Sequence, residues 1–302
     1  MRIVFMGTPE FARRPLKKLY DDGFEIAGVF TQADKPQNRG MKVCFSPVKE
    51  FAIEQKIPVF QPTTLRDGTA VKILSELYCD LIVVVAYGKM LPKEILDIPA
   101  FGCVNIHASL LPKYRGAAPI QHAILNGEFE TGVTSMMMAE EMDAGDVLFT
   151  EKVIIGNDET AAELTDRLSR AGAGLLCETV KAISNGTAVR TPQDHNKATF
   201  APLLKKEMSP IDWAQPAAAI KNKVRGLIPW PVATMELGGK PVKVFSVETT
   251  GEITDKPPGA IVSTRGCGLE VACADGTVII NELQAPGGKR MTATDYLRGN
   301  PV

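Results

Sequence analysis

The chain has 302 residues, of which 45% are hydrophobic and 23% charged, and its formal net charge is -1. This length favours two domains, and the composition is that of an ordinary globular protein. The charge excludes a globally basic nucleic-acid binder but leaves room for a local basic patch. No window is long and apolar enough to span a bilayer.

The N-terminal part of the sequence alternates strand and helix patterns. Apolar runs predict strands at 2–6, 24–30, 81–86 and 101–107, and amphipathic patterns predict helices at 119–125 and 160–184. Thr8 followed by Pro9 predicts a helix start, with Thr8 as N-cap. The alternation predicts an α/β fold with a mostly parallel, doubly wound sheet, in which ligands bind at the carboxyl ends of the strands.

Asn105 and His107 stand two residues apart at such a strand end, so their side chains should share one face. Asp143 follows in a turn that Gly145 makes feasible. Together, an amide, an imidazole and a carboxylate support acyl transfer without a metal or a covalent intermediate. The competing interpretation is a structural histidine near a strand end and an ordinary hairpin turn. The six cysteines show no zinc-ligand spacing, and we expect them to be reduced thiols.

The segment 31–49 is a long connection for a doubly wound fold. It carries four basic residues, Lys35, Arg39, Lys42 and Lys49, against a single acid. Long connections without structure of their own are often functional, and clustered lysine and arginine suit phosphates. A basic finger beside the active site and a solvated surface loop are both consistent with this pattern.

Residues 189–207 lose the periodic pattern and predict a linker. Beyond it, a short helix at 217–225 and several short strands separated by glycine-containing turns predict a small five-stranded barrel of the OB type. The basic residues of this part form either a solvated face or a nucleic-acid-binding stripe: Lys205, Lys206, Lys221, Lys223, Arg225, Lys289 and Arg290.

At this point the motifs resemble a known family. Asn105-x-His107 with the Ser-Leu-Leu-Pro run at 109–112, and Asp143 downstream, is similar to the formyltransferases that use 10-formyltetrahydrofolate. The stretches 6–12, 38–40 and 114–120 and the Pro-Trp-Pro at 229–231 resemble the methionyl-tRNA formyltransferase family in particular. The resemblance covers essentially the whole chain.

The resemblance implies a Rossmann-like formyltransferase domain at 1–188, a linker at 189–207 and a C-terminal OB-like tRNA-binding domain at 208–302. The implied site residues fall into three groups. They are the catalytic residues Asn105, His107 and Asp143, the folate-binding residues Ser109, Leu110, Leu111 and Pro112, and the tRNA-binding residues Lys35, Arg39 and Lys42.

The implied reaction transfers the formyl group of 10-formyltetrahydrofolate to the amino group of methionyl-initiator tRNA. We expect no metal, no membrane contact, and a monomer in the cytoplasm. Two alternatives stay open from the residues themselves. One is a formyltransferase acting on a small acceptor, such as a sugar nucleotide or a phosphoribosyl amide. The other is a non-enzymatic RNA-binding protein with a degenerate catalytic domain.

Overall fold

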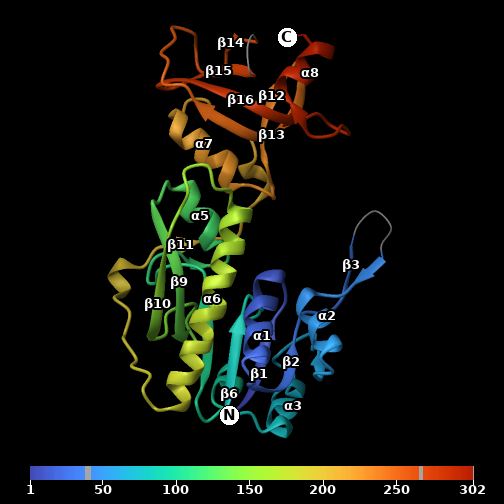
Figure 1. Cartoon of the computed structure of the whole chain (residues 1–302), viewed down its shortest axis with the longest axis vertical. Helices are drawn as coiled ribbons and strands as arrows, with labels where there is room; N and C mark the ends of the chain where they lie inside the picture. The colour runs from blue at the N-terminus through green and yellow to red at the C-terminus, as the bar shows by residue number, and fades with distance from the viewer. Residues whose placement is uncertain (38–41, 265–267, 302) are drawn as a thin grey trace. The chain divides into compact units, whose positions relative to one another are not determined.

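The computed structural model describes residues 1–37, 42–264 and 268–301 (Figure 1). The chain forms two compact units. The first contains Met1–Pro119, Glu130–Ile154 and Thr165–Ala201, and the second contains Ile120–Phe129, Ile155–Leu164 and Pro202–Val302. The first part of the predicted linker, residues 189–201, therefore packs within the first unit. Within the described ranges, no helix is long and apolar enough to cross a membrane.

The first unit is built on a seven-stranded sheet with the order β10-β9-β7-β6-β1-β2-β5. Five neighbouring strands pair in parallel, and β9 at the other end of the sheet pairs antiparallel with both β7 and the edge strand β10. The strand order reverses between β1 and β6, which is where open α/β sheets bind ligands. The strands are β1 (Arg2–Gly7), β2 (Glu25–Phe30), β5 (Val59–Phe60), β6 (Leu81–Val85), β7 (Cys103–His107), β9 (Glu130–Met137) and β10 (Val147–Ile154).

Helices cover both faces of this sheet. Ile3 and Phe5 of β1 share one apolar core with α1, α2 and α6, whereas Val4 and Met6 share the other with α3 and α4. A strand buried on both faces needs apolar residues at every position, which explains the unbroken run Leu81–Val85. These helices are α1 (Glu10–Asp21), α2 (Pro47–Glu54), α3 (Thr69–Leu77), α4 (Lys93–Leu96) and α6 (Ala161–Ser184). The remaining helix of this part of the sequence, α5 (Pro119–Leu125), belongs to the second unit apart from Pro119.

The predicted α/β class and the predicted strands are confirmed to within two residues at each end. The helix start at Thr8 is wrong, because α1 begins one residue later with Pro9 as N-cap. The Thr8 hydroxyl instead accepts a hydrogen bond from the Gln32 backbone N–H at 3.3 Å, tying the end of β1 to the end of β2. At the start of α6, Thr160 and Glu163 form a reciprocal capping box.

The second unit contains a small antiparallel sheet with the path β12-β13-β16-β15-β14, and β17 also pairs with β16. Its core is formed by the apolar residues that alternate along one face of this sheet, packed against α7 and α8. This antiparallel sheet agrees with the small barrel domain predicted from the sequence. The elements are α7 (Ala217–Gly226), β12 (Ala233–Leu237), β13 (Lys240–Thr249), β14 (Ile261–Ser263), β15 (Leu269–Cys273), β16 (Gly276–Gln284), β17 (Met291–Thr292) and α8 (Ala293–Gly299).

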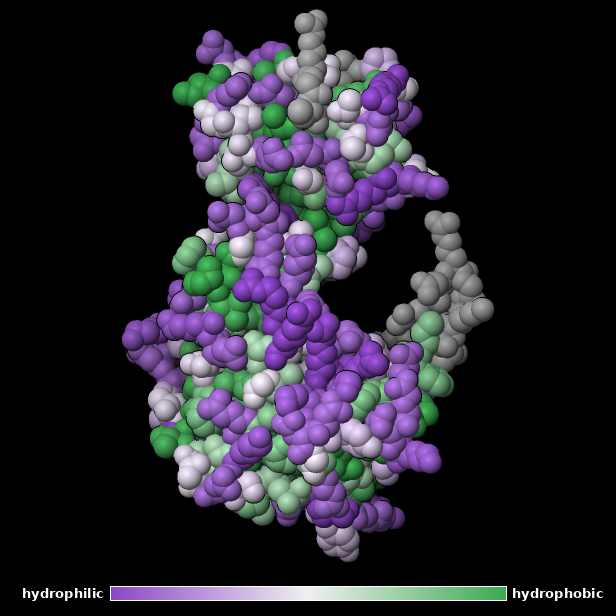
Figure 2. Space-filling model, viewed as in Figure 1, coloured by the Kyte–Doolittle hydropathy of each residue, from purple (hydrophilic) through white to green (hydrophobic). Residues whose placement is uncertain are grey.

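Two short pairs of strands complete the fold. β3 (Lys35–Gln37) and β4 (Lys42–Cys44) form an antiparallel hairpin inside the segment 31–49. β8 (Arg115–Gly116) pairs with β11 (Phe200–Ala201), which brings the chain after α6 back to the loop after β7. On the face seen in Figure 2, hydrophilic side chains predominate over both units and apolar ones occur in small groups, as expected of solvent-facing surface.

Candidate active site

The candidate site begins at the carboxyl end of β7. Asn105 and His107 lie on the same side of this strand, which hydrogen-bonds to β6 on one side and β9 on the other. Asn105 is half-buried and His107 is buried. Among the residues that the structure describes, the Asn105 amide has no hydrogen-bond partner. This amide is therefore available to a ligand.

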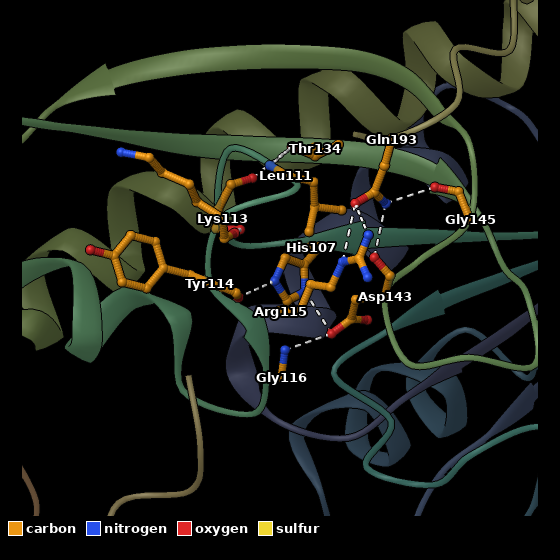
Figure 3. Close-up of polar contacts among 11 residues, drawn as sticks. His107, Leu111, Lys113, Tyr114, Arg115, Gly116, Thr134, Asp143, Gly145 and Gln193 are labelled. Carbon is orange, nitrogen blue, oxygen red and sulfur yellow. Dashed lines mark hydrogen bonds and ion pairs between the residues drawn. The ribbon is translucent and has the colours of Figure 1, made fainter. Parts of the chain in front are cut away.

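Both ring nitrogens of His107 face oxygen atoms (Figure 3). Nε2 lies 2.9 Å from the Tyr114 carbonyl oxygen, which only accepts hydrogen bonds, so Nε2 carries a proton. Nδ1 lies 3.6 Å from Asp143 Oδ2. That distance is an ion-pair contact but too long for a hydrogen bond. The Tyr114 carbonyl thus fixes the ring orientation and leaves Nδ1 as the nitrogen that can exchange a proton.

Asp143 comes from a separate loop between β9 and β10. Its Oδ2 accepts a hydrogen bond from the Gly116 N–H at 2.8 Å, and its side chain is 16% exposed. Its φ of 50° lies in the left-handed region, which aspartate tolerates better than most residues. Gly145 is required by close packing, since a Cβ there would lie 1.9 Å from the Met137 carbonyl oxygen. The structure therefore brings together all three predicted catalytic residues.

The predicted folate residues 109–112 form the loop directly after β7. Ser109 is fully buried; its hydroxyl donates to the Lys113 carbonyl at 2.6 Å, and its carbonyl accepts from Thr134 Oγ1 at 2.6 Å. The Leu111 N–H donates to the same Thr134 oxygen at 3.2 Å. These contacts make Ser109 a support of the loop. A folate contact by residues 109–112 stays a prediction.

Two buried thiols of the first unit, those of Cys103 and Cys177, are poor nucleophiles. Burial raises the pKa of Cys103 to about 12 and, with the neighbouring Asp22, that of Cys177 to about 11. A thiol with so high a pKa holds almost no thiolate near neutral pH. This chemistry agrees with the acyl transfer predicted for the amide, imidazole and carboxylate.

Of the predicted tRNA-binding residues, Lys35 lies in β3 and Lys42 in β4, and Arg39 lies outside the described residues. The segment 31–49 is therefore not a structureless loop, because its strands β3 and β4 pair as an antiparallel hairpin. Lys49 is not a free cation of a basic finger either. It lies in α2, where its Nζ donates to Asp34 and to Gln61 Oε1 and sits 4.0 Å from the centre of the Phe45 ring.

The Lys49–Asp34 contact should stabilise the base of the hairpin. Hydrogen bonds from Lys49 and Gln61 lower the pKa of Asp34. This stability is present above the unfolded-state pKa of about 3.9 and is lost as the pH falls through the lower folded-state pKa. We expect Lys49→Met to reduce the free energy of unfolding by about 1 kcal/mol at neutral pH.

Urea denaturation at pH 7 and at pH 3 measures this effect. The loss caused by Lys49→Met should shrink at the lower pH. Lys17→Met is the matched control, because Lys17 pairs with Asp21 across two well-exposed side chains and should contribute little. A stability loss that is equal at both pH values would contradict the assignment to the Asp34 carboxylate.

Most of the basic residues that the sequence grouped as a C-terminal stripe contact protein atoms. Lys221 pairs with Asp158, and Lys223 donates to the Pro210 carbonyl. Arg225 Nη1 donates to the Gly156 and Glu159 carbonyls at 2.8 and 3.1 Å. Arg290 pairs with Glu282. These contacts stabilise the second unit. Less positive charge is therefore free to bind a nucleic acid than the sequence alone indicated.

Comparison with known proteins identifies the family. Residues 1–180 match the formyl transferase family and residues 203–301 match the formyl transferase C-terminal domain. A methionyl-tRNA formyltransferase of Alkaliphilus oremlandii is 48% identical over 302 residues, covering 100% of this chain and 97% of that protein. The chain belongs to the methionyl-tRNA formyltransferase family. A family relative from Acetivibrio thermocellus is also 48% identical, over 100% of this chain and 97% of its own.

Two solved structures share the fold of this chain. A sugar 3N-formyltransferase, WlaRD, crystallised with dTDP and 5-N-formyl-THF, matches with a TM-score of 0.71 at 18% identity, over 96% of this chain and 99% of its own. HypX of Aquifex aeolicus in complex with tetrahydrofolic acid matches with a TM-score of 0.67 at 20% identity. That match covers 98% of this chain but 47% of HypX. The family and fold expected from the motifs are thereby confirmed.

Proposed function

We propose that this chain transfers the formyl group of 10-formyltetrahydrofolate to the free amino group of methionyl-initiator tRNA, with Asn105, His107 and Asp143 as its catalytic residues. One observation carries the assignment of the residues. The Asp143 carboxylate, which comes from a separate loop, lies 3.6 Å from His107 Nδ1. The strand of His107 also presents the Asn105 amide, which no described residue hydrogen-bonds. The family relatives supply the reaction, since they are methionyl-tRNA formyltransferases along their whole length.

The chemistry needs donors for an oxyanion. When the neutral amine attacks the formyl carbon, negative charge develops on the formyl oxygen, and donors aimed at that oxygen lower the barrier. The Asn105 amide supplies one donor. His107 supplies the second from Nδ1 in its protonated form, because Nε2 already donates to the Tyr114 carbonyl. No enzyme nucleophile takes part.

Asp143 completes the arrangement. Its carboxylate faces Nδ1 at 3.6 Å and orients the ring for donation. The amine must also lose a proton while N10 of the folate gains one as the carbon–nitrogen bond breaks. Asp143 and His107 assist this exchange, directly or through a water molecule. The remaining rate enhancement comes from holding the folate and the aminoacyl end together.

The family comparison also supports a division of labour along the chain. Residues 1–188 bind folate and carry out the chemistry, with 109–112 at the folate. Residues 189–207 connect to 208–302, which bind tRNA together with Lys35, Arg39 and Lys42 of the hairpin segment. We place this activity in a monomer in the cytoplasm, without membrane contact.

Arg39→Ala is expected to weaken the use of tRNA without changing the chemistry on folate. Loss of one phosphate contact should lower kcat/KM for methionyl-tRNA by about tenfold and reduce the slope of its salt dependence by about one. Steady-state kinetics at several salt concentrations measure both. The KM for 10-formyltetrahydrofolate is the internal control and should not move. An unchanged kcat/KM for tRNA would remove Arg39 from the interface.

A single assay separates the proposed function from its alternatives. The protein is incubated with labelled 10-formyltetrahydrofolate and either charged initiator tRNA or small amines. We expect formyl transfer to the methionine on tRNA. Transfer to small amines alone would establish a small-molecule formyltransferase. Binding of the tRNA without transfer would establish an RNA-binding protein.

A further inference from the structure

Gln193 has every hydrogen-bonding position of its side chain filled around the loop of Asp143. Its Nε2 donates to the Asp143 carbonyl at 2.8 Å and to the Gly145 carbonyl at 2.7 Å. Its Oε1 accepts from Arg115 Nε at 3.2 Å and Nη2 at 2.8 Å (Figure 3). Carbonyls only accept and guanidinium groups only donate, so this amide orientation is the one the contacts allow.

Arg115 is the anchor of this arrangement. It is 1% exposed, although arginine is rarely so buried without strong partners. Besides Gln193, its Nη2 lies 3.3 Å from His195 Nδ1, and its Nη1 lies 3.6 Å from the exposed Glu141. A buried guanidinium is costly unless its donors are satisfied. Gln193 and Arg115 therefore hold each other in place between the loop after β7 and the loop before β10.

The segment 193–201, which contains Gln193, also fixes the loop after β7. The Tyr114 N–H donates to Thr199 Oγ1 at 2.9 Å, and the Arg115 N–H donates to the Thr199 carbonyl at 2.8 Å. Tyr114 carries the carbonyl that accepts from His107, and Gly116 carries the N–H that donates to Asp143. Residues 193–201 thus contact both loops that orient the catalytic pair.

We propose that Gln193, held by Arg115, is a positioning residue for Asp143, so that the segment after α6 is part of the active site and not only a connection. This inference rests on the proposed catalytic role of Asp143. Asp143 has a left-handed φ of 50°, which aspartate tolerates better than most residues but which still depends on the contacts around it. The two hydrogen bonds from Gln193 Nε2 bracket this residue, at its own carbonyl and at that of Gly145.

Gln193→Glu removes the hydrogen bonds that Gln193 donates to the Asp143 loop while keeping its contact with Arg115. A glutamate at 193 still accepts from Arg115, but it loses both donations to the loop and places a carboxylate oxygen against two carbonyls. Misplacement by about 1 Å can cost about 10²-fold in rate. We expect Gln193→Glu to remain folded, because its carboxylate still pairs with Arg115, and to lower kcat by about 10- to 100-fold, with little change in KM for either substrate. A wild-type kcat in Gln193→Glu would overturn the proposal.

A double-mutant cycle tests whether Gln193 acts through Asp143. Single-turnover formylation with enzyme in excess is measured for Gln193→Ala, Asp143→Ala and the double variant. We expect Gln193→Ala to slow transfer about 10- to 100-fold in the wild-type background and less than about threefold in the Asp143→Ala background. Equal effects in both backgrounds would make Gln193 merely structural and overturn the inference.

The same cycle distinguishes a failure of the proposed function from a failure of the positioning role of Gln193. Near-wild-type transfer by Asp143→Ala alone would contradict the proposed function. A strong loss in Asp143→Ala together with normal transfer in both Gln193 variants would contradict only the positioning role. Ser169→Ala is the matched control, because Ser169 is buried in the same unit and donates to the Phe11 carbonyl at 3.0 Å, away from these loops. It should lower stability without changing kcat.

Discussion

Replacing His107 by alanine is expected to lower kcat for formyl transfer by about 10²- to 10³-fold, because one oxyanion donor and the proton-exchanging Nδ1 disappear together. The KM values should change little, since these contacts strengthen in the transition state. Asn105→Ala and Asp143→Ala should each lower kcat by a factor of the same order. Steady-state kinetics on methionyl-tRNA with saturating 10-formyltetrahydrofolate measure all three.

Glu140→Gln provides the control for the His107, Asn105 and Asp143 variants. Glu140 is an exposed carboxylate in the same loop as Asp143, so its neutralisation should leave kcat near wild type. If all three alanine variants turned over at near-wild-type rates, the assignment of the site would be wrong. If they lost only affinity for tRNA, the three residues would be binding residues and not catalytic ones.

Gly145→Ala is expected to be severely damaging although it adds a single methyl group. Its Cβ would lie 1.9 Å from the Met137 carbonyl oxygen and 2.9 Å from the carbonyl carbon, and both atoms belong to backbone. The loop must therefore move away from the end of β9, and Asp143 moves with it. We expect a loss of about 3 kcal/mol in the free energy of unfolding and at least about 10²-fold in kcat.

Gly174→Ala is the matched control for this substitution. Gly174 lies within α6, and a Cβ there meets no atom within 4 Å. Alanine favours a helix over glycine, so this variant should be as stable as the wild type or up to about 1 kcal/mol more stable. Thermal unfolding and kcat are measured for both variants. A Gly145→Ala enzyme with normal stability and kcat would show that the loop does not depend on the close approach.

The sequence predicted the parts of the fold that depend on local pattern. The apolar run at 81–86 indicated a strand buried on both faces, and the 3.6-residue period indicated α6 almost to the residue. Asn105 and His107 were found because a side-chain period of two and a strand end suffice to place them together. Asp143 was added because an imidazole needs an acidic partner, although nothing local connects residues so far apart in sequence, and the family resemblance supported that choice.

Other features depend on contacts that no local pattern records. The antiparallel pairing of β9 with β7 and β10 is set by the tertiary structure, and the sequence 130–137 was not assigned as a strand. Thr8 looked like an N-cap, but its hydroxyl accepts from Gln32 instead. Lys49 looked like a phosphate ligand because its partner Asp34 lies fifteen residues earlier, brought near only by the fold.

Gln193 was missed for a similar reason. It stands in a stretch rich in polar residues and proline, which is typical of a linker. Its function comes from two carbonyls about fifty residues earlier and from a buried arginine about eighty residues earlier. A polar segment that returns to the active site has the same composition as one that merely connects two domains, so only the structure distinguishes them.

The most direct test of the central claim is formyl transfer in a single turnover by the wild type and by the triple variant Asn105→Ala/His107→Ala/Asp143→Ala. Affinities for methionyl-tRNA and for 10-formyltetrahydrofolate are measured in parallel by direct binding. We expect unchanged tRNA affinity and a transfer rate at least about 10³-fold below wild type. A triple variant that binds the tRNA and transfers the formyl group at the wild-type rate would contradict that claim.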